Sequence, residues 1–243
     1  MQIIADTHVH TIASEHAFST VMENLREAKA KGMRFLAVTD HTGLMPGAPT
    51  DTYFICLRGT IPEQYDGVYL LRGCEVNILD EKGTLDLPEH VLDQLEWVIA
   101  SVHGVLTKPM TVEQSTEMWL NVAKNPKVDV IGHCGDANFR FDFERVIPEF
   151  GKYGKIVEIN AGSYRTRPSC IPNCIEVARL CAKYGVPLVL SSDAHFAGRV
   201  GDVEDAIRIV TEANVPEELI LNANPTAFAA RLEKRTGRKF SLG

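Results

Sequence analysis

The sequence predicts an α/β fold in which repeated strand–helix units surround a parallel sheet. Short runs rich in β-branched residues alternate with amphipathic segments along the chain, and this alternation is typical of βα units. The length of 243 residues is close to the roughly 250 residues of one α/β barrel. We therefore favour a single domain over residues 1–243 rather than two smaller domains.

Seven segments have the composition of buried strands, since each is short, apolar and bounded by polar or turn-forming residues. In chain order they are residues 2–6, 35–40, 69–75, 97–101, 128–132, 156–160 and 187–192. These apolar runs are far shorter than the roughly 20 residues that cross a bilayer, so the sequence predicts no transmembrane segment.

Five further segments have helical periodicity. They are residues 19–31, 111–124, 171–184, 203–213 and 225–235. The second begins with a capping-box pair, Thr111 and Gln114, and the third ends before Gly185. The last follows Asn224, a good helix-capping residue, and we expect it to cover one end of the structure. Residues 42–67 have no clear periodicity, so we predict an irregular rim or lid there.

Composition narrows the classes of function. With 45% hydrophobic and 23% charged residues, the chain has the make-up of an ordinary globular protein. The formal net charge of −7 opposes an extended nucleic-acid-binding surface, which needs clustered Lys and Arg, and favours a small-molecule substrate. The start of the sequence lacks a signal-peptide pattern, so we expect a cytoplasmic protein. The six cysteines form no CxxC pair and are interpreted as reduced thiols.

Side chains that bind metals gather where the predicted strands end. They are His8, His10, His41, Glu75, His103, His133, Asp193 and His195. The carboxyl ends of the strands in a parallel barrel meet at one face, so one rim can collect them all, and His16 can reach it from the loop before the first helix. Imidazole and carboxylate groups bind zinc and other divalent first-row ions. Nine such donors suggest two or three ions.

Two short motifs support this interpretation. Alternate side chains of an extended strand share a face, so His8 and His10 converge on one ion. Asp193 and His195 repeat the same spacing on the last predicted strand. The two ends of the chain are therefore predicted to meet in one site.

Single residues of this kind also have an ordinary structural interpretation. A lone histidine at a strand end is more often hydrogen-bonded than metal-bound, and only the combined set favours a metal site. His90 follows a helix start and is predicted to be a solvated surface residue. Asp6 and Asp40 closely precede histidines and are predicted to accept the second ring proton of those histidines. A capping or turn role is the alternative for both.

The ordered set of motifs resembles the polymerase and histidinol phosphatase (PHP) family across nearly the whole chain. The matching segments are Asp6-Thr7-His8-Val9-His10, Thr39-Asp40-His41, Gly73-Cys74-Glu75, His103, Gly132-His133 and Ser192-Asp193-Ala194-His195. Within the family the chain is most similar to the small stand-alone YcdX-like phosphatases. The resemblance implies a distorted, TIM-like (β/α) barrel of seven strands with a trinuclear zinc site. It also implies a homo-oligomer, namely a trimer.

The resemblance further implies which residues hold which ion. Its three groups of ligands are His8, His10, Glu75 and Asp193 for one ion; Glu75, His103 and His133 for a second; and His16, His41 and His195 for the third. Glu75 bridges the first two ions. Zinc is the expected metal, with manganese or iron as alternatives. The main departure from the family pattern is Thr42-Gly43, which leaves the ligands intact but the substrate open.

These residues predict a metal-dependent phosphoesterase, in particular a phosphatase that hydrolyses small phosphomonoesters with water activated by the ions. Glu75, Asp193 and His195 are the residues that we expect to be essential for catalysis. Arg165, after the sixth predicted strand, is the first candidate for binding phosphate, although solvated loop arginines are the more frequent case. Two alternatives stay open. One is an amidohydrolase acting on a C–N bond, and the other is a non-catalytic metal-binding protein.

Overall fold

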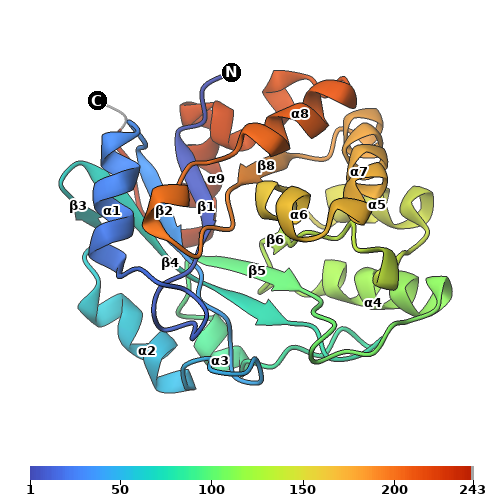
Figure 1. The fold of residues 1–243 in the computed structure, drawn as a ribbon, viewed down its shortest axis with the longest axis horizontal. Helices are drawn as coiled ribbons and strands as arrows, with labels where there is room; N and C mark the ends of the chain where they lie inside the picture. Colours follow the sequence, from blue (N-terminus) through green and yellow to red (C-terminus); the bar gives the residue numbers. More distant parts are fainter. Residues whose placement is uncertain (242–243) are drawn as a thin grey trace.

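A parallel sheet forms the centre of the molecule. The computed structural model describes residues 1–241, and Figure 1 shows the sheet with helices around it. Seven strands pair in parallel in the order β1-β2-β4-β5-β6-β7-β8, and the short β3 pairs antiparallel with β4. The strands are β1 Ala5–Val9, β2 Phe35–Val38, β3 Gln64–Tyr65, β4 Val68–Asn77, β5 Trp97–Ser101, β6 Val130–Ile131, β7 Ile156–Asn160 and β8 Leu188–Ser191. The seven parallel strands confirm the predicted α/β fold.

The sheet curves into a nearly closed barrel, and the seam lies between β1 and β8. Val9 and Ala194 form a parallel bridge at one end of the seam. Further along it, the side-chain amide of Asn222 donates to the carbonyl oxygens of Ala5, at 2.9 Å, and Leu190, at 2.7 Å. The side-chain carbonyl of Asn222 accepts from the Leu190 amide at 3.0 Å. One buried side chain therefore satisfies backbone groups of both strands where no continuous ladder joins them.

Nine α-helices lie within residues 1–241. They are α1 Val21–Ala30, α2 Asp51–Thr60, α3 Glu89–Leu92, α4 Val112–Lys124, α5 Phe143–Lys152, α6 Ala161–Thr166, α7 Ile171–Tyr184, α8 Glu204–Glu212 and α9 Pro225–Thr236. The predicted capping box at the start of α4 is formed, since Thr111 and Gln114 exchange side-chain to backbone hydrogen bonds. Gly185 ends α7 in the left-handed conformation that glycine tolerates best. Within the described residues, the helices are too short or too polar to cross a bilayer.

Several parts of the chain are more regular than the sequence predicts, among them α6, which lies outside every predicted segment. Residues 42–67, predicted to be irregular, contain α2 and β3, so that prediction is wrong. The pattern was hard to recognise because α2 buries only Phe54 and Leu57. The sequence also did not predict α5, because Pro148 and Gly151 lie within it and both disfavour a helix. Packing against α4 and α7 overrides that local preference.

The end of the barrel where the strands begin is filled with apolar side chains. Phe35, Trp97 and Ile156 project from three different strands into this cluster. Phe228 and Leu232 of α9 pack against them, and the rings of Phe35 and Phe228 meet edge to face at 5.1 Å. The last helix therefore covers one end of the barrel, as the sequence predicts. The polar side chains of the predicted metal site lie at the opposite end, where the strands finish.

We expect Asn222→Ala to lower the free energy of unfolding by about 2–4 kcal/mol, because buried backbone groups of Ala5 and Leu190 lose their partner. The measurement is urea unfolding followed by circular dichroism. Asn138→Ala is the matched control, since this exposed side chain makes no hydrogen bond within residues 1–241. Equal destabilisation by the two substitutions would contradict the role given to Asn222.

Candidate metal centre

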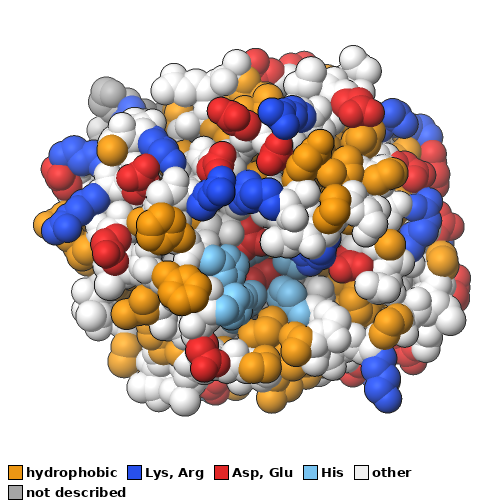
Figure 2. All heavy atoms as spheres, viewed as in Figure 1, with side chains coloured by type: hydrophobic (Ala, Val, Ile, Leu, Met, Phe, Trp, Pro, Cys, Tyr) orange, Lys and Arg blue, Asp and Glu red, His pale blue; other side chains and the backbone are white. Residues whose placement is uncertain are grey.

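The predicted metal ligands lie together at the carboxyl ends of the strands. His8 and Glu75 belong to β1 and β4, and most of the others directly follow β1, β2, β5, β6 or β8. Figure 2 shows pale blue histidines and red acidic side chains in a hollow that hydrophobic and basic side chains border. Six of the seven parallel strands therefore contribute to one cluster. His90 is exposed at the start of α3, as predicted.

Glu75 occupies the middle of the cluster. One carboxylate oxygen, Oε2, lies 2.8 Å from His41 Nδ1 and 3.3 Å from His8 Nε2. The other, Oε1, lies 2.8 Å from His133 Nε2 and 3.3 Å from His103 Nε2. The two oxygens thus face different sets of histidines. A carboxylate placed in this way can bridge two ions.

His8, His10 and Asp193 bring their donor atoms close together. The Nε2 atoms of His8 and His10 are 3.1 Å apart. Asp193 Oδ1 lies 3.2 Å from His10 Nε2 and 3.6 Å from His8 Nε2. Donor atoms of His8, His10 and Glu75 all lie within 4.8 Å of one another. The first and last strands therefore meet in one set of donors, as the two motifs predict.

The buried His41 and the partly exposed His195 belong to a second set of donors. Their nitrogens lie within 4.8 Å of each other and of a His10 nitrogen. The exposed His16 stacks beside both, with ring centroids 5.0 Å from His41 and 4.8 Å from His195. His10 therefore lies between the two sets, whereas the family resemblance assigns it to one of them.

Three histidines have a hydrogen-bond acceptor at Nδ1. The acceptor of His8 is Glu158 Oε1 at 2.6 Å, and that of His103 is Asn77 Oδ1 at 2.7 Å. The acceptor of His195 is the backbone carbonyl two residues earlier, at 3.0 Å. Because these oxygens have no proton to donate, each Nδ1 carries the proton. Nε2 is therefore the nitrogen that each of these rings presents for metal binding.

Asp6 does not take the role that the sequence predicts for it. Its carboxylate accepts hydrogen bonds from the Ser192 amide at 3.1 Å, from the Ser192 hydroxyl and from the Gly201 amide at 2.7 Å. It accepts no ring proton from His8. The pairing register of β1 and β2 shifts between Asp6 and Val9, so strict alternation of faces is not kept across this stretch. Asp6 instead joins β1 to the segment after β8.

Asp40 also orients no imidazole directly. Its carboxylate accepts from the Thr11 amide at 2.7 Å and from the Ser14 hydroxyl at 2.8 Å. The Tyr53 hydroxyl of α2 donates to it at 2.6 Å. The His41 amide in turn donates to Ser14 Oγ at 3.1 Å. Asp40 thus fixes the loops that carry the histidines rather than a ring proton.

Glu158 belongs to the site although the histidine pattern does not predict it. This side chain is buried in β7. Besides contacting His8, it accepts hydrogen bonds from the His133 amide at 2.7 Å and from the Ser191 hydroxyl. A single carboxylate inside an apolar strand was the available signal, because a buried charge needs a partner.

The buried carboxylates control protonation in the cluster. Burial disfavours the charged form of His8, but nearby carboxylates, Glu158 first, outweigh it and raise its pKa well above the ordinary value. Burial disfavours ionised Glu75, but the charge of His8 and other histidines holds the pKa of Glu75 well below the ordinary value. Burial and the charge of His41 lower the pKa of His10. The centre therefore keeps ionised carboxylates and attracts positive charge.

Other features of the cluster fit divalent ions. His41 Nδ1 and Asp193 Oδ1 are buried and have no aligned hydrogen-bond partner within the described chain. Such atoms cost roughly 1–3 kcal/mol each, so a partner from outside the protein fits them. Asp193 and His133 have positive φ angles of 55° and 21°. Backbone strain of this kind persists at functional sites where the surrounding structure enforces it. The nitrogen and oxygen donors suit zinc, manganese or iron.

Arg165 lies beside the cluster. It lines a cavity of about 280 Å³ together with Asp193 and His195. Its guanidinium donates to the Ser192 carbonyl at 3.2 Å, and the side chain is 30% exposed. Arg165 therefore shares a solvent-accessible space with two of the predicted ligands, which is the position required of a phosphate-binding group.

Together, the barrel and the buried donors at its carboxyl end define a barrel protein with a metal-binding centre. The chain belongs to the PHP domain family, whose model matches residues 6–162. It is similar to a probable phosphatase of Caldanaerobacter subterraneus subsp. tengcongensis, with 43% identity over 240 residues, 98% of this chain and 94% of the relative. It is also similar to a probable phosphatase of Clostridium novyi, with 38% identity over 236 residues, 97% and 96% of the two chains. These findings confirm the resemblance seen in the motifs.

Solved structures share the fold. Histidinol phosphate phosphatase from Lactococcus lactis, solved with zinc, L-histidinol and phosphate, has a TM-score of 0.63 and 16% identity. The match covers 88% of this chain and 95% of that chain. A chain of an archaeal ribonuclease P has a TM-score of 0.59 and 11% identity, and the match covers 98% and 95%. At these identities the likeness supports the distorted barrel and does not extend to the reaction.

We expect Glu158→Gln to weaken metal binding by roughly 10- to 100-fold, because the amide keeps the shape but no longer holds the Nδ1 proton of His8 as strongly. Metal retained during competition with a chelator, measured by mass spectrometry, checks this. Glu149→Gln, which alters only a surface pair with Lys152, is the control. Equal metal retention by both variants would contradict the role of Glu158 in metal binding.

Proposed function

We propose that this chain is a phosphatase that hydrolyses small phosphomonoesters at a centre of three divalent ions, with zinc the first choice. The observation that carries the proposal is the position of Glu75, whose two oxygens face separate sets of histidines. Each ion takes one of three groups of ligands: His8, His10, Glu75 and Asp193; Glu75, His103 and His133; or His16, His41 and His195.

At the coarser level, the chain is a metal-dependent phosphoesterase and therefore a hydrolase. Relatives that align over almost its whole length are named probable phosphatases. The Lactococcus lactis enzyme with the same fold was solved with zinc and phosphate. These names support a small phosphorylated substrate for this chain too.

The protein's own groups bind, orient and shield the reacting atoms. When bound, divalent ions supply positive charge and Lewis acidity, which can lower the pKa of a coordinated water to about 7. Glu75 and Asp193 provide the buried negative charge that retains cations. The proton on His8 Nδ1, held by Glu158, keeps Nε2 directed at the centre. Arg165 can donate two parallel hydrogen bonds to phosphoryl oxygens.

Purified without chelator, the protein should contain close to three equivalents of metal and release inorganic phosphate from a panel of phosphomonoesters. Removing the metal should abolish release, and adding zinc or manganese should restore it. Metal analysis by mass spectrometry and a phosphate assay provide the two measurements. Hydrolysis confined to amides would favour an amidohydrolase, and full metal loading without turnover would favour a non-catalytic metal-binding protein.

His103→Ala and His195→Ala should each lower kcat/KM for phosphomonoesters by at least roughly 100-fold, because each removes a donor from the cluster. Circular dichroism verifies that the fold is retained. His90→Ala provides a matched control, because His90 is exposed at the start of α3. Phosphate release that survives in either ligand variant would contradict the ligand assignment.

A further inference from the structure

The cavity beside the metal centre has two aromatic walls. Phe18 precedes α1 and is 72% exposed, and Phe196 follows β8 and is 58% exposed. Both line the cavity of about 280 Å³ that also contains Asp193 and His195. Large aromatic rings are usually covered, and their exposure at the edge of a polar site marks a binding surface.

The backbone ties these two walls to the metal centre. The Phe18 amide donates to the His195 carbonyl at 2.8 Å. A second bond lies close by, because the Ala197 amide donates to the Ser19 hydroxyl, also at 2.8 Å. Phe196 directly follows His195 in the chain. The backbone segments that carry the two rings are therefore joined to each other beside the predicted ligand His195.

Two glycines preserve the space around these groups. A Cβ atom at Gly162, on the cavity wall, would lie 3.0 Å from both Asp193 Cβ and Asn160 Oδ1. A Cβ atom at Gly198 would lie 3.0 Å from the Phe196 ring. Any larger residue would press on a metal ligand or on an aromatic wall.

The charges that line the cavity are largely paired within the protein. Arg199 Nη1 lies 2.7 Å from Asp202. Arg165 Nη1 lies 3.9 Å from Asp202 and 3.8 Å from Asp205. These carboxylates offset the two guanidinium charges, so little charge remains to select a second anionic group. The aromatic faces provide the main unpartnered surface.

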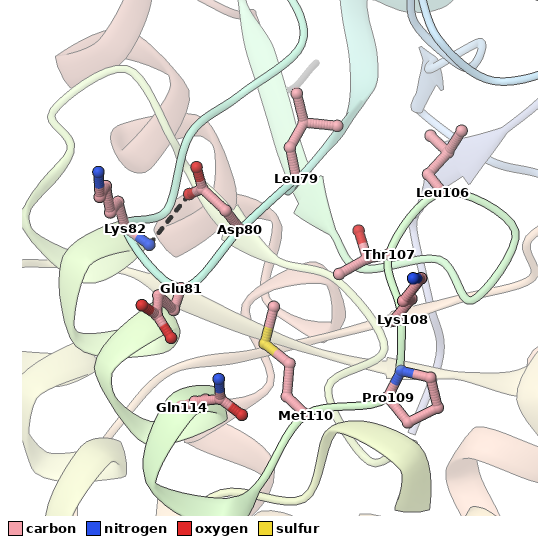
Figure 3. A pocket seen from close by; sticks show the side chains of 10 residues that line it. All are labelled: Leu79, Asp80, Glu81, Lys82, Leu106, Thr107, Lys108, Pro109, Met110 and Gln114. Carbon is pink, nitrogen blue, oxygen red and sulfur yellow. Dashed lines mark hydrogen bonds between the residues drawn. The ribbon is translucent and has the colours of Figure 1, made fainter.

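Another cavity on the molecule does not adjoin the centre. It has a volume of about 430 Å³ and lies between the segments after β4 and β5 (Figure 3). Its walls mix Asp80 and Glu81 with Lys82 and Lys108, and the Asp80 carboxylate is hydrogen-bonded to the Lys82 amide. None of the nine predicted ligands lines it. Of these two cavities, only the one lined by Phe18 and Phe196 therefore contains predicted ligands.

We infer that Phe18 and Phe196 form a leaving-group subsite that selects phosphomonoesters of alcohols carrying a flat, uncharged aromatic ring. This inference rests on the proposed phosphatase function. The cavity volume of about 280 Å³ lies just below the roughly 300–1,000 Å³ of typical ligand sites, and so favours a small ring over a nucleotide. The rings supply stacking surface, and the metal centre receives the phosphate.

The test compares 2-phenylethyl phosphate with ethyl phosphate. Both release a primary alcohol, so they differ mainly in the ring. The wild-type enzyme should favour the phenylethyl ester by roughly tenfold or more in kcat/KM. Phe18→Ala and Phe196→Ala should each lower this ratio by roughly three- to tenfold. Leu44→Ala is the matched control and should keep the ratio, because Leu44 is 58% exposed but does not line the cavity.

A measurement on the wild-type enzyme keeps the test independent of variant folding. Inhibition by 2-phenylethylphosphonate should be roughly tenfold stronger than inhibition by ethylphosphonate. Equal hydrolysis and equal inhibition would overturn the subsite and leave the phosphatase function standing. Failure to hydrolyse any phosphomonoester would overturn the proposed function and the inference with it. If both phenylalanine variants lose oligomers while the substrate ratio stays unchanged, the rings form an interface between copies of the chain. That result would also overturn the subsite.

Discussion

Closure of the barrel between its first and last strands is the constraint on which the metal centre depends. His8 lies in β1, His10 directly follows it, and Asp193 and His195 follow β8, so the donors meet only if this seam closes. At the site end, the His10 amide donates to the Ala194 carbonyl at 2.9 Å. This contact joins His10, a predicted ligand, to Ala194, which lies between the predicted ligands Asp193 and His195. Stability and site assembly are coupled at this point.

Charge provides the second constraint. Glu75 and Glu158 are buried carboxylates, and the partly exposed carboxylate of Asp193 lies beside Glu75 and the same histidines. Buried charges of one sign are costly unless cations or hydrogen-bond donors compensate them. The raised pKa of His8 is one form of compensation. Divalent ions are a stronger one, because each brings two charges to oxygens that are already positioned. Binding of divalent ions therefore lowers the electrostatic cost of burying these carboxylates in an apolar barrel.

The sequence predicted the parts of the structure that depend on local patterns. β5 and β7 match their predicted bounds, and the rim of histidines follows from strand-end positions. The roles of Asp6 and Glu158 did not follow in this way. The role of Asp6 depends on an irregularity in the pairing of β1 and β2. That of Glu158 depends on which strand of the closed barrel faces His8. Both roles depend on contacts between residues far apart in the sequence, so residue spacing alone does not predict them.

The predicted metal ligands and the residues that line the cavity come from different kinds of segment, and this difference matters for substrate selectivity. Most predicted ligands lie in or directly after strands, where ladder hydrogen bonds restrict their motion, whereas Phe18 and Arg165 come from a loop and a short helix. Barrels with TM-scores of 0.63 and 0.59 to this one occur in a histidinol phosphate phosphatase and in an archaeal ribonuclease P. A fold that occurs in such different proteins does not by itself set substrate preference. Function depends on the side chains placed around the site rather than on the fold, and here a loop and the segment after β8 place aromatic rings beside the predicted ligands.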